Sequence, residues 1–455
     1  MKLDTIRLEN FRCFERLEVD FHEQLTVLIA KNGQGKSTVL DAIAMSLAPY
    51  VTQFEYGESE SLPRLQEADV HRRRVTHPQE PSLFTTEKSP FPATIHSRYS
   101  HKNVLRYDKV PTLQNLASYV SSGMGELSHD VTPLPTFGKT LRQWDYDRKH
   151  VLFPVVAYYG TGRLHSQQSL AEIDIEEFTS LEESRSRGYY ECLSSRSSYG
   201  HFLYGIKVWA DESNNQYQLQ QQGGDATNYY NTLITRVMKS IQDCLEDYNY
   251  QQLAYSYKHK DFIIHTPNGV LPLSQLSDGM RNIITMVGDI AYRLHTLNPW
   301  VEDDIEGVIL IDEIEMHLHP SWQQTILGKL MKAFPQVQFI VTTHSPQVVS
   351  TVPQKCLRII HDGEVMRPSA YTEGRDSAAI LAEIMGVDPL PTDLEINKRY
   401  LHLLDMISRE HDEEEMRKSV EDFGKCFGPD HPSHLDLQQQ LRLREYKRRL
   451  AERKK

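Results

Sequence analysis

The chain has 455 residues, which is enough for one large α/β domain with a second lobe or a sizeable insertion. Its 50 basic and 62 acidic residues give a formal net charge of −12, which excludes a global attraction to nucleic acid; any such contact needs a local basic patch or a partner. Five scattered cysteines without a C-x-x-C pair exclude a disulfide framework or a zinc ribbon and favour a reducing compartment.

The first residues alternate apolar and polar side chains over 3–8 and 14–21, which predicts two short antiparallel strands of a half-buried sheet. They contain no apolar signal-peptide core, and no stretch approaches the roughly 18–20 apolar residues that a membrane span requires. We therefore expect a cytoplasmic protein without membrane contact. Residues 25–30 then predict a buried strand, and Ser37 opens a predicted helix.

Residues 51–150 show no clear periodicity and include a basic cluster, Arg72–Arg74, so we expect an inserted region of loops and a few helices. A strongly apolar strand follows at 151–159. The polar stretch 165–200 predicts an exposed lobe. A helix is expected over 227–247, followed by short strands at 253–257 and 262–265 and a turn at Asn268-Gly269.

From residue 271 the chain alternates helices and strands in the order of a parallel sheet covered by helices. The expected elements are a helix at 278–296, a strand at 307–311, a helix at 320–333, and strands at 338–342, 357–360 and 364–366. Residues from 376 onward are expected to be mainly helical, with an acidic run at 412–415 and a basic end at 441–455. The predicted division is 1–50, 51–150, 151–270, 271–370 and 371–455. The first and fourth segments carry the two ends of the α/β core, the second is an inserted region, and the third is the remainder of the core with a polar lobe. The last is a helical partner-binding segment with a basic tail.

A glycine-rich segment between the predicted strand 25–30 and the following helix has the spacing of a phosphate-binding loop. It departs from that pattern in having Ala30 at the first position, and its location argues against a chance glycine turn. Gly33 and Gly35 allow backbone N–H groups to point at an anion, Lys36 can reach the β- and γ-phosphates, and the Ser37 hydroxyl can ligate Mg²⁺. The expected ATP contacts are Lys31, Asn32, Gly33, Gln34, Gly35, Lys36, Ser37 and Thr38.

The apolar run 307–311 ends in two carboxylates, where an α/β sheet presents groups to a ligand. Asp312 is expected to hold Mg²⁺, mostly through water. Glu313 is expected to orient the attacking water as general base.

Three further segments resemble motifs of ABC-type ATPases. The sequence 276–281, LSDGMR, resembles their LSGGQ signature, so Ser277, Asp278 and Gly279 are expected to contact ATP held by another subunit; an ordinary serine N-cap is the alternative. The strand ending in His344 resembles the switch-histidine loop that senses the γ-phosphate. Residues 315–320 resemble the dimer-facing loop, with a metal site at His317 and His319 as the less favoured alternative.

Together with the N-terminal segment 8–14, these motifs appear in the order found in the RecF, SMC and Rad50 group of ABC-type ATPases, and the resemblance spans residues 1 to about 365. It implies an α/β fold with a mixed sheet covered by helices, an inserted region and a mainly helical C-terminal segment. It also implies ATP and Mg²⁺ as cofactors, ATP sandwiched between the subunits of a homo-oligomer, Glu313 and His344 as catalytic residues, and Arg12 as an ATP contact.

Within this group, segments 158–164 and 374–381 look like those of PtuA-like ATPases of Septu or retron-associated anti-phage systems, which work with an HNH nuclease, PtuB. The resemblance implies a sensor and regulatory ATPase that controls such a nuclease, bound through the C-terminal helices. The roughly 90 residues after 365 lack the Glu followed by D-x-D that the TOPRIM nuclease of OLD-like relatives needs, and we find no H-N-H constellation, so we expect no nuclease site in the chain itself.

Two alternatives remain open. One is a DNA-repair or recombination ATPase of RecF or Rad50 type that clamps DNA directly; the other is a chain that holds ATP as a structural ligand. The basic tail and Arg72–Arg74 are interpreted first as solvated surface, with contact to nucleic acid or an acidic partner as the alternative.

Overall fold

Contacts divide the chain into two units, Met1–Ile380 and Leu381–Lys455. The computed structural model describes residues 1–55, 62–77, 80–101, 113–121, 133–147, 150–164, 184–195, 200–221, 229–246, 252–256, 261–266, 269–302, 304–409 and 413–452. In this part of the chain no helix is both long and apolar enough to cross a membrane.

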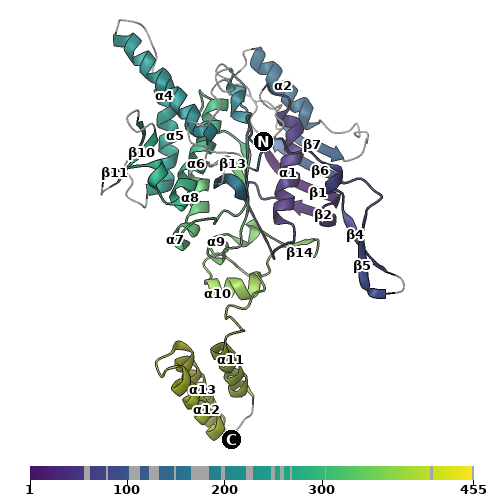
Figure 1. Cartoon of the computed structure of the whole chain (residues 1–455), viewed down its shortest axis with the longest axis vertical. Helices are drawn as coiled ribbons and strands as arrows, with labels where there is room; N and C mark the ends of the chain where they lie inside the picture. Colours follow the sequence, from purple (N-terminus) through teal and green to yellow (C-terminus); the bar gives the residue numbers. More distant parts are fainter. Residues whose placement is uncertain are drawn as a thin grey trace. The chain divides into compact units, whose positions relative to one another are not determined.

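The first unit is built on a six-stranded sheet (Figure 1). In spatial order its strands are β15 (Glu364–Met366), β14 (Leu357–His361), β3 (Leu25–Ala30), β13 (Val337–Thr342), β12 (Gly307–Ile311) and β8 (Val155–Tyr159). All neighbours are parallel except β15, which runs antiparallel to β14. Every residue of β3, β8, β12 and β13 is buried, as expected for parallel strands covered on both faces. The expectation of a mixed α/β sheet is confirmed.

A second, antiparallel sheet corrects the prediction for residues 51–150. Its order is β2 (Phe14–Asp20), β1 (Lys2–Phe11), β6 (Thr94–His101) and β7 (Leu113–Ser121). The described part of 51–150 therefore contains four strands, where loops and a few helices were expected. It also holds the hairpin β4 (Arg72–His77) and β5 (Glu80–Lys88) and one longer helix, α2 (Leu134–Tyr146). The sequence does not show the alternation of apolar and polar residues that predicts a strand, because polar Ser97 and His101 occupy the buried face of β6.

Helices fill the space between and around these sheets. Helix α1 (Lys36–Val51) contacts β6 and β7 of one sheet and β3, β12 and β13 of the other, so it is buried nearly all round. Helix α6 (Asp278–Leu297) packs against α4 (Gly200–Gln221), α5 (Tyr229–Leu245) and β8. Beside them lies a three-stranded sheet of β9 (Gln252–Ser256), β10 (Asp261–Thr266) and β11 (Gly269–Pro272).

Some expected elements differ in detail. The predicted helix 320–333 is two helices, α7 (Pro320–Gln323) and α8 (Ile326–Ala333), followed later by the short α9 (Pro346–Val349). The stretch 165–200 was expected to be an exposed lobe, but its described residues 184–195 include the buried Tyr189 and Cys192. Asn268 of the expected turn lies outside the described residues.

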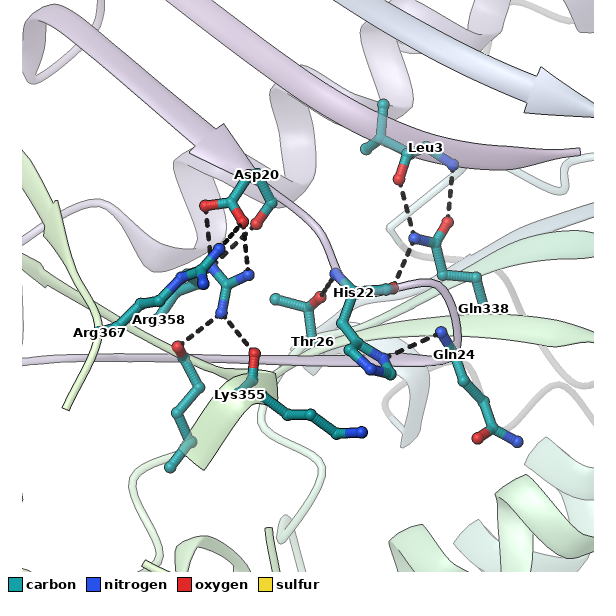
Figure 2. Close-up of polar contacts among 10 residues, drawn as sticks. Leu3, Asp20, His22, Gln24, Thr26, Gln338, Lys355, Arg358 and Arg367 are labelled. Carbon is teal, nitrogen blue, oxygen red and sulfur yellow. Dashed lines mark hydrogen bonds and ion pairs between the residues drawn. The ribbon is translucent and has the colours of Figure 1, made fainter. Parts of the chain in front are cut away.

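Two buried polar side chains join the N-terminal strands to the six-stranded sheet (Figure 2). The Gln338 amide on β13 accepts from Leu3 N at 2.7 Å and donates to the carbonyl oxygens of Leu3 and His22 at 2.9 and 3.0 Å. Arg358 on β14 donates to Asp20 at the end of β2. Although partial burial opposes ionisation of Asp20, its bonds to Arg358 and Arg367 hold its pKa below the usual value.

Replacing Gln338 by Ala is expected to lower the free energy of unfolding of the first unit by about 2–4 kcal/mol, because it leaves buried backbone groups of β1 without partners. Urea unfolding followed by tryptophan fluorescence measures the change. The matched control is Gln24→Ala, since the Gln24 side chain is half-buried and donates one hydrogen bond, to the exposed carbonyl of Pro335 at 3.4 Å; it is expected to change stability by less than about 0.5 kcal/mol. Equal effects of the two variants would contradict the prediction.

The second unit is helical, as expected. After α10 (Ser377–Ala379) and a π-helical turn at Ile380–Ile384 come α11 (Glu395–Ser408), α12 (Glu413–Phe427) and α13 (Pro432–Glu452). These three helices share a core of their own, formed by Leu403, Ile407, Met416, Val420, Phe423, Leu437 and Leu441.

Candidate nucleotide-binding site

The phosphate loop lies between β3 and α1, where the sequence placed it. Gly33 and Gly35 have φ of 79° and 89°, a left-handed conformation that favours glycine. Gly35 is the N-cap of α1, so the loop leads directly into the positive end of that helix. Ala30 is the last residue of β3, where the extended backbone accepts any side chain. This loop has the form of an anion-binding nest at a helix N-terminus.

Lys36 connects the loop to the carboxylates that follow β12. Its Nζ donates to the carbonyl of Ala30 at 3.2 Å, at the base of the loop. Burial lowers the pKa of Lys36, and the nearby Asp312, Glu313 and Glu315 carboxylates act in the opposite direction. The lysine and the carboxylates predicted from separate motifs therefore share one electrostatic environment.

The rest of the loop has mixed exposure. Lys31, Asn32 and Ser37 are exposed, and Thr38 is half-buried. Gln34 is fixed by two bonds to the turn after β14: its amide donates to Asp362 Oδ1 at 3.3 Å, and Asp362 N donates to Gln34 Oε1 at 2.9 Å. A hollow of about 650 Å³ adjoins this edge of the loop, lined in part by Phe14, Gly33 and Gln34.

Asp312 and Glu313 stand at the carboxyl end of β12, and the adjacent strand fixes both. The Thr342 hydroxyl donates to Asp312 Oδ1 at 2.5 Å and accepts from Glu313 N at 2.8 Å. Asp312 is buried, whereas Glu313 is partly exposed and has a φ of 48°, rare for a residue other than glycine. Solvent reaches Glu313 but is largely excluded from Asp312. This arrangement suits a pair in which Asp312 holds a cation and Glu313 holds a water molecule.

Glu315 is a functional candidate that the sequence analysis missed. Its carboxylate accepts from the Thr343 hydroxyl at 2.7 Å and from His344 N at 2.5 Å. It thus holds the backbone of the predicted switch loop beside the Asp312–Glu313 pair. The sequence does show Glu315 as a third carboxylate two residues after Glu313. Its partner His344 lies 29 residues away, so no local pattern predicts the contact.

Replacing Glu315 by Ala is expected to lower the turnover number for ATP hydrolysis about 10- to 100-fold, because a misplacement near 1 Å at a reacting group costs that much. Affinity for ATP should stay within about threefold, since the phosphate loop is unchanged. Steady-state hydrolysis and titration with a fluorescent ATP analogue measure the two quantities. Thr343→Val, which removes one of the two bonds, should have the smaller effect. A loss of affinity as large as the loss of turnover would refute this role.

The predicted signature residues lie at the start of α6. Ser277 is the N-cap, but its side chain makes no capping hydrogen bond, so capping does not account for this serine. Ser277 and Asp278 are exposed, and Asp278 pairs with Arg281. Gly279 is packed against the 316–318 turn: a Cβ there would lie 2.3 Å from the carbonyl oxygen of His317.

The remaining predicted residues are placed as follows. Arg12 lies in the β1–β2 turn, where its guanidinium binds Asp41 of α1 and Asp69. His344 is half-buried, two residues beyond the end of β13. His319 is the N-cap of α7, accepting from Ser321 N. Among the described residues no group of three or more His, Cys, Asp or Glu side chains is placed to hold a metal ion.

The structure thus gathers the phosphate loop, Asp312, Glu313 and the His344 loop at one edge of the six-stranded sheet. The signature segment begins beside the turn that follows these carboxylates, since Gly279 packs on the carbonyl of His317, whereas the rest of α6 packs mainly against α4, α5 and β8.

Comparison with known proteins identifies the family of the chain and several relatives. A family model described as an AAA domain matches residues 5–252, and a second one, an AAA domain described as a putative AbiEii toxin of a type IV TA system, matches 167–350. Retron Ec83 probable ATPase of Escherichia coli is 24% identical over 98% of this chain and 87% of its own length. Retron Vc95 probable ATPase of Vibrio cholerae is 26% identical over 84% and 78%.

A third relative matches a shorter part of the chain. Septu protein PtuA of Bacillus thuringiensis is 31% identical over 38% of this chain and 46% of its own length. Among solved structures, the SMC head bound to the C-terminal winged-helix domain of ScpA covers 82% of this chain at 12% identity and a TM-score of 0.43. The first family model covers more than half of the chain. The chain therefore belongs to the AAA-domain family, and it is similar to the ATPases named for retron and Septu systems.

Proposed function

We propose that this ATPase is the sensor and regulatory subunit of a bacterial anti-phage defence complex, in which ATP-dependent assembly of the chain controls a separate HNH-type nuclease. The observation that carries the proposal is the similarity to a retron ATPase over 98% of the chain, combined with a phosphate loop beside a pair of carboxylates. The relatives support an ATPase that acts in anti-phage defence. The HNH-type nuclease and its control by this chain are the part that we propose.

The residues of the site divide into distinct roles. Backbone N–H groups of the loop 31–38 and the Lys36 ammonium bind the phosphates, and the hollow beside Phe14 takes the nucleoside. Ser37 and Asp312 supply the oxygen ligands that Mg²⁺ prefers, and the ion neutralises phosphate charge when bound. Glu313 accepts a proton from the attacking water, and His344 contacts the γ-phosphate.

The site is completed by a second copy of the chain. Ser277 and Asp278, at the start of α6, are exposed, and α6 packs on elements other than those around α1. A serine hydroxyl not used for capping, at the positive end of a 20-residue helix, suits a phosphate supplied by another subunit. ATP then links two copies, and its hydrolysis weakens the link.

The second unit offers a surface for the nuclease. Leu443, Tyr446 and Leu450 on α13 are 45%, 61% and 40% exposed and follow helical spacing along one face. The core of this unit uses other residues of the same helix, Leu437 and Leu441. An apolar stripe with an aromatic residue, set among arginines, has the composition of a protein-binding hot spot.

The test is co-purification from the native operon, followed by mass measurement of the intact complex with and without ATP. A small HNH-type protein travelling with an even-numbered oligomer is the expected result. Leu443→Ser with Tyr446→Ser should release that protein while ATP hydrolysis continues. Tyr217→Ser, at a comparably exposed tyrosine on α4, is the matched control and should retain it.

A chain that emerges alone and dimerises only with ATP and duplex DNA would instead support the DNA-clamp alternative. Such a clamp should bind duplex DNA with a steep dependence on salt concentration.

A further inference from the structure

Arg163 is a buried arginine that joins three parts of the nucleotide-binding unit. It lies in the short turn Thr161–Leu164 that follows β8, and only 1% of it is exposed. Its guanidinium donates to the carbonyl oxygens of Gly160 at 3.0 Å, Asp312 at 2.6 Å and Glu313 at 2.9 Å, and its Nε donates to Asn282 Oδ1 at 3.1 Å. One planar group therefore bridges β8, β12 and α6.

The bonds to residues 312 and 313 act on the backbone that carries the two catalytic carboxylates. Glu313 has a φ of 48°, a conformation that persists only where its surroundings enforce it. The Arg163 guanidinium binds the carbonyl oxygen of Glu313, and the Thr342 hydroxyl binds its backbone N–H. Together these two bonds enforce the positive φ of Glu313. Lysine cannot replace this geometry, because a single ammonium lacks the rigid fork of donors.

The hydrogen bond from Arg163 to Asn282 connects the backbone of residues 312 and 313 to the signature segment 276–281. Asn282 is 1% exposed in the second turn of α6, and its amide also donates to the carbonyl of Met316 at 3.2 Å. Gly279, one turn earlier, rests on the carbonyl of His317. The start of α6, the 316–318 turn and the backbone of the carboxylate pair are thus one hydrogen-bonded body.

We infer that Arg163 is a positioning residue that couples the carboxylates of one nucleotide site to the signature segment serving the neighbouring site. A displacement of the Glu313 backbone at one site moves Asn282, and with it Ser277 and Gly279, through this guanidinium. This inference rests on the proposed two-subunit site; the coupling itself is not part of that proposal.

The test uses mixed oligomers of two inactive variants. A Ser277→Arg protomer keeps its phosphate loop and carboxylates, and a Glu313→Gln protomer keeps its signature segment. Mixing them creates one intact site per mixed pair, so hydrolysis should return to about a quarter of the wild-type rate for random pairing. Failure to recover any activity would count against the two-subunit site itself.

Arg163→Gln is then added to the Glu313→Gln protomer. This protomer supplies only its signature segment to the one intact site of the mixed pair, so Arg163→Gln can affect that site only through α6. We expect hydrolysis by the mixture to fall at least about fivefold, the lower end of the usual range for coupled sites. Asn282→Ala in the same protomer removes only the α6 end of the link and should lower the rate similarly, which keeps the test valid if Arg163→Gln folds poorly. Unchanged hydrolysis with both variants, after recovery with the parent pair, would overturn the coupling.

A matched control separates coupling from general damage to α6. Arg185 is another largely buried arginine, and it donates to the carbonyl of Leu297 at the far end of that helix and to Val151. Arg185→Gln in the Glu313→Gln protomer should leave hydrolysis by the mixture within about twofold of the parent pair. A loss equal to that from Arg163→Gln would show that any weakening of α6 suffices and would refute the specific link.

Discussion

Replacing Glu313 by Gln is expected to lower the turnover number for ATP hydrolysis by a factor of about 100 or more while ATP binding persists. The change removes the proton acceptor but keeps the size of the side chain, and the backbone of residue 313 remains held by Thr342 and Arg163. The phosphate loop and Asp312 are untouched, so the nucleotide still binds.

The same variant should accumulate the assembled form. If ATP links two copies and hydrolysis releases them, blocking hydrolysis shifts the equilibrium towards the ATP-bound oligomer by mass action. Mass photometry or light scattering with and without ATP measures the shift, and phosphate release measures turnover.

Glu18→Gln is the matched control, because Glu18 is exposed on β2; its turnover should equal that of the wild type. An unchanged turnover in Glu313→Gln would mean that ATP serves as a structural ligand and that Glu313 is not the general base.

Replacing Gly35 by Ala is expected to weaken ATP binding by about two orders of magnitude, or to prevent the loop from forming. At this position φ is 89°, and a Cβ would lie 2.4 Å from Cζ of Phe14 and 2.6 Å from Sγ of Cys13. Strain in the backbone alone costs about 1–2 kcal/mol for a non-glycine residue. The collision adds to it, because Phe14 is buried at the start of β2 and has little room to move.

Gly33 provides the matched comparison within the same loop. Its φ is 79°, but no atom lies within 4 Å of the position that a Cβ would occupy, so Gly33→Ala carries the conformational strain without the collision. We expect Gly33→Ala to weaken binding about 5- to 30-fold, the equivalent of about 1–2 kcal/mol. Calorimetric titration with ATP measures both variants, and equal losses would show that φ alone, rather than contact with Phe14, makes Gly35 necessary.

The sequence by itself determined the local elements of the candidate site, whose residues are neighbours in the chain. The loop around Gly33, Gly35 and Lys36 and the pair Asp312–Glu313 could be identified because a strand, a turn and a helix start form locally and leave a readable spacing. The covered parallel sheet around β3, β12 and β13 followed for the same reason, since continuous apolar runs separated by helices predict it.

Only the tertiary structure decided which distant residues support that site. The partners of Glu315 lie up to 29 residues away, Arg163 reaches Asp312 across 149 positions, and Gln338 binds Leu3 across 335. Strands β6 and β7 escaped prediction because polar residues such as Ser97 and Ser118 occupy buried positions, so polar and apolar side chains do not alternate along them. Such contacts depend on the register of strands that pair far apart in the chain, and no local pattern records that register.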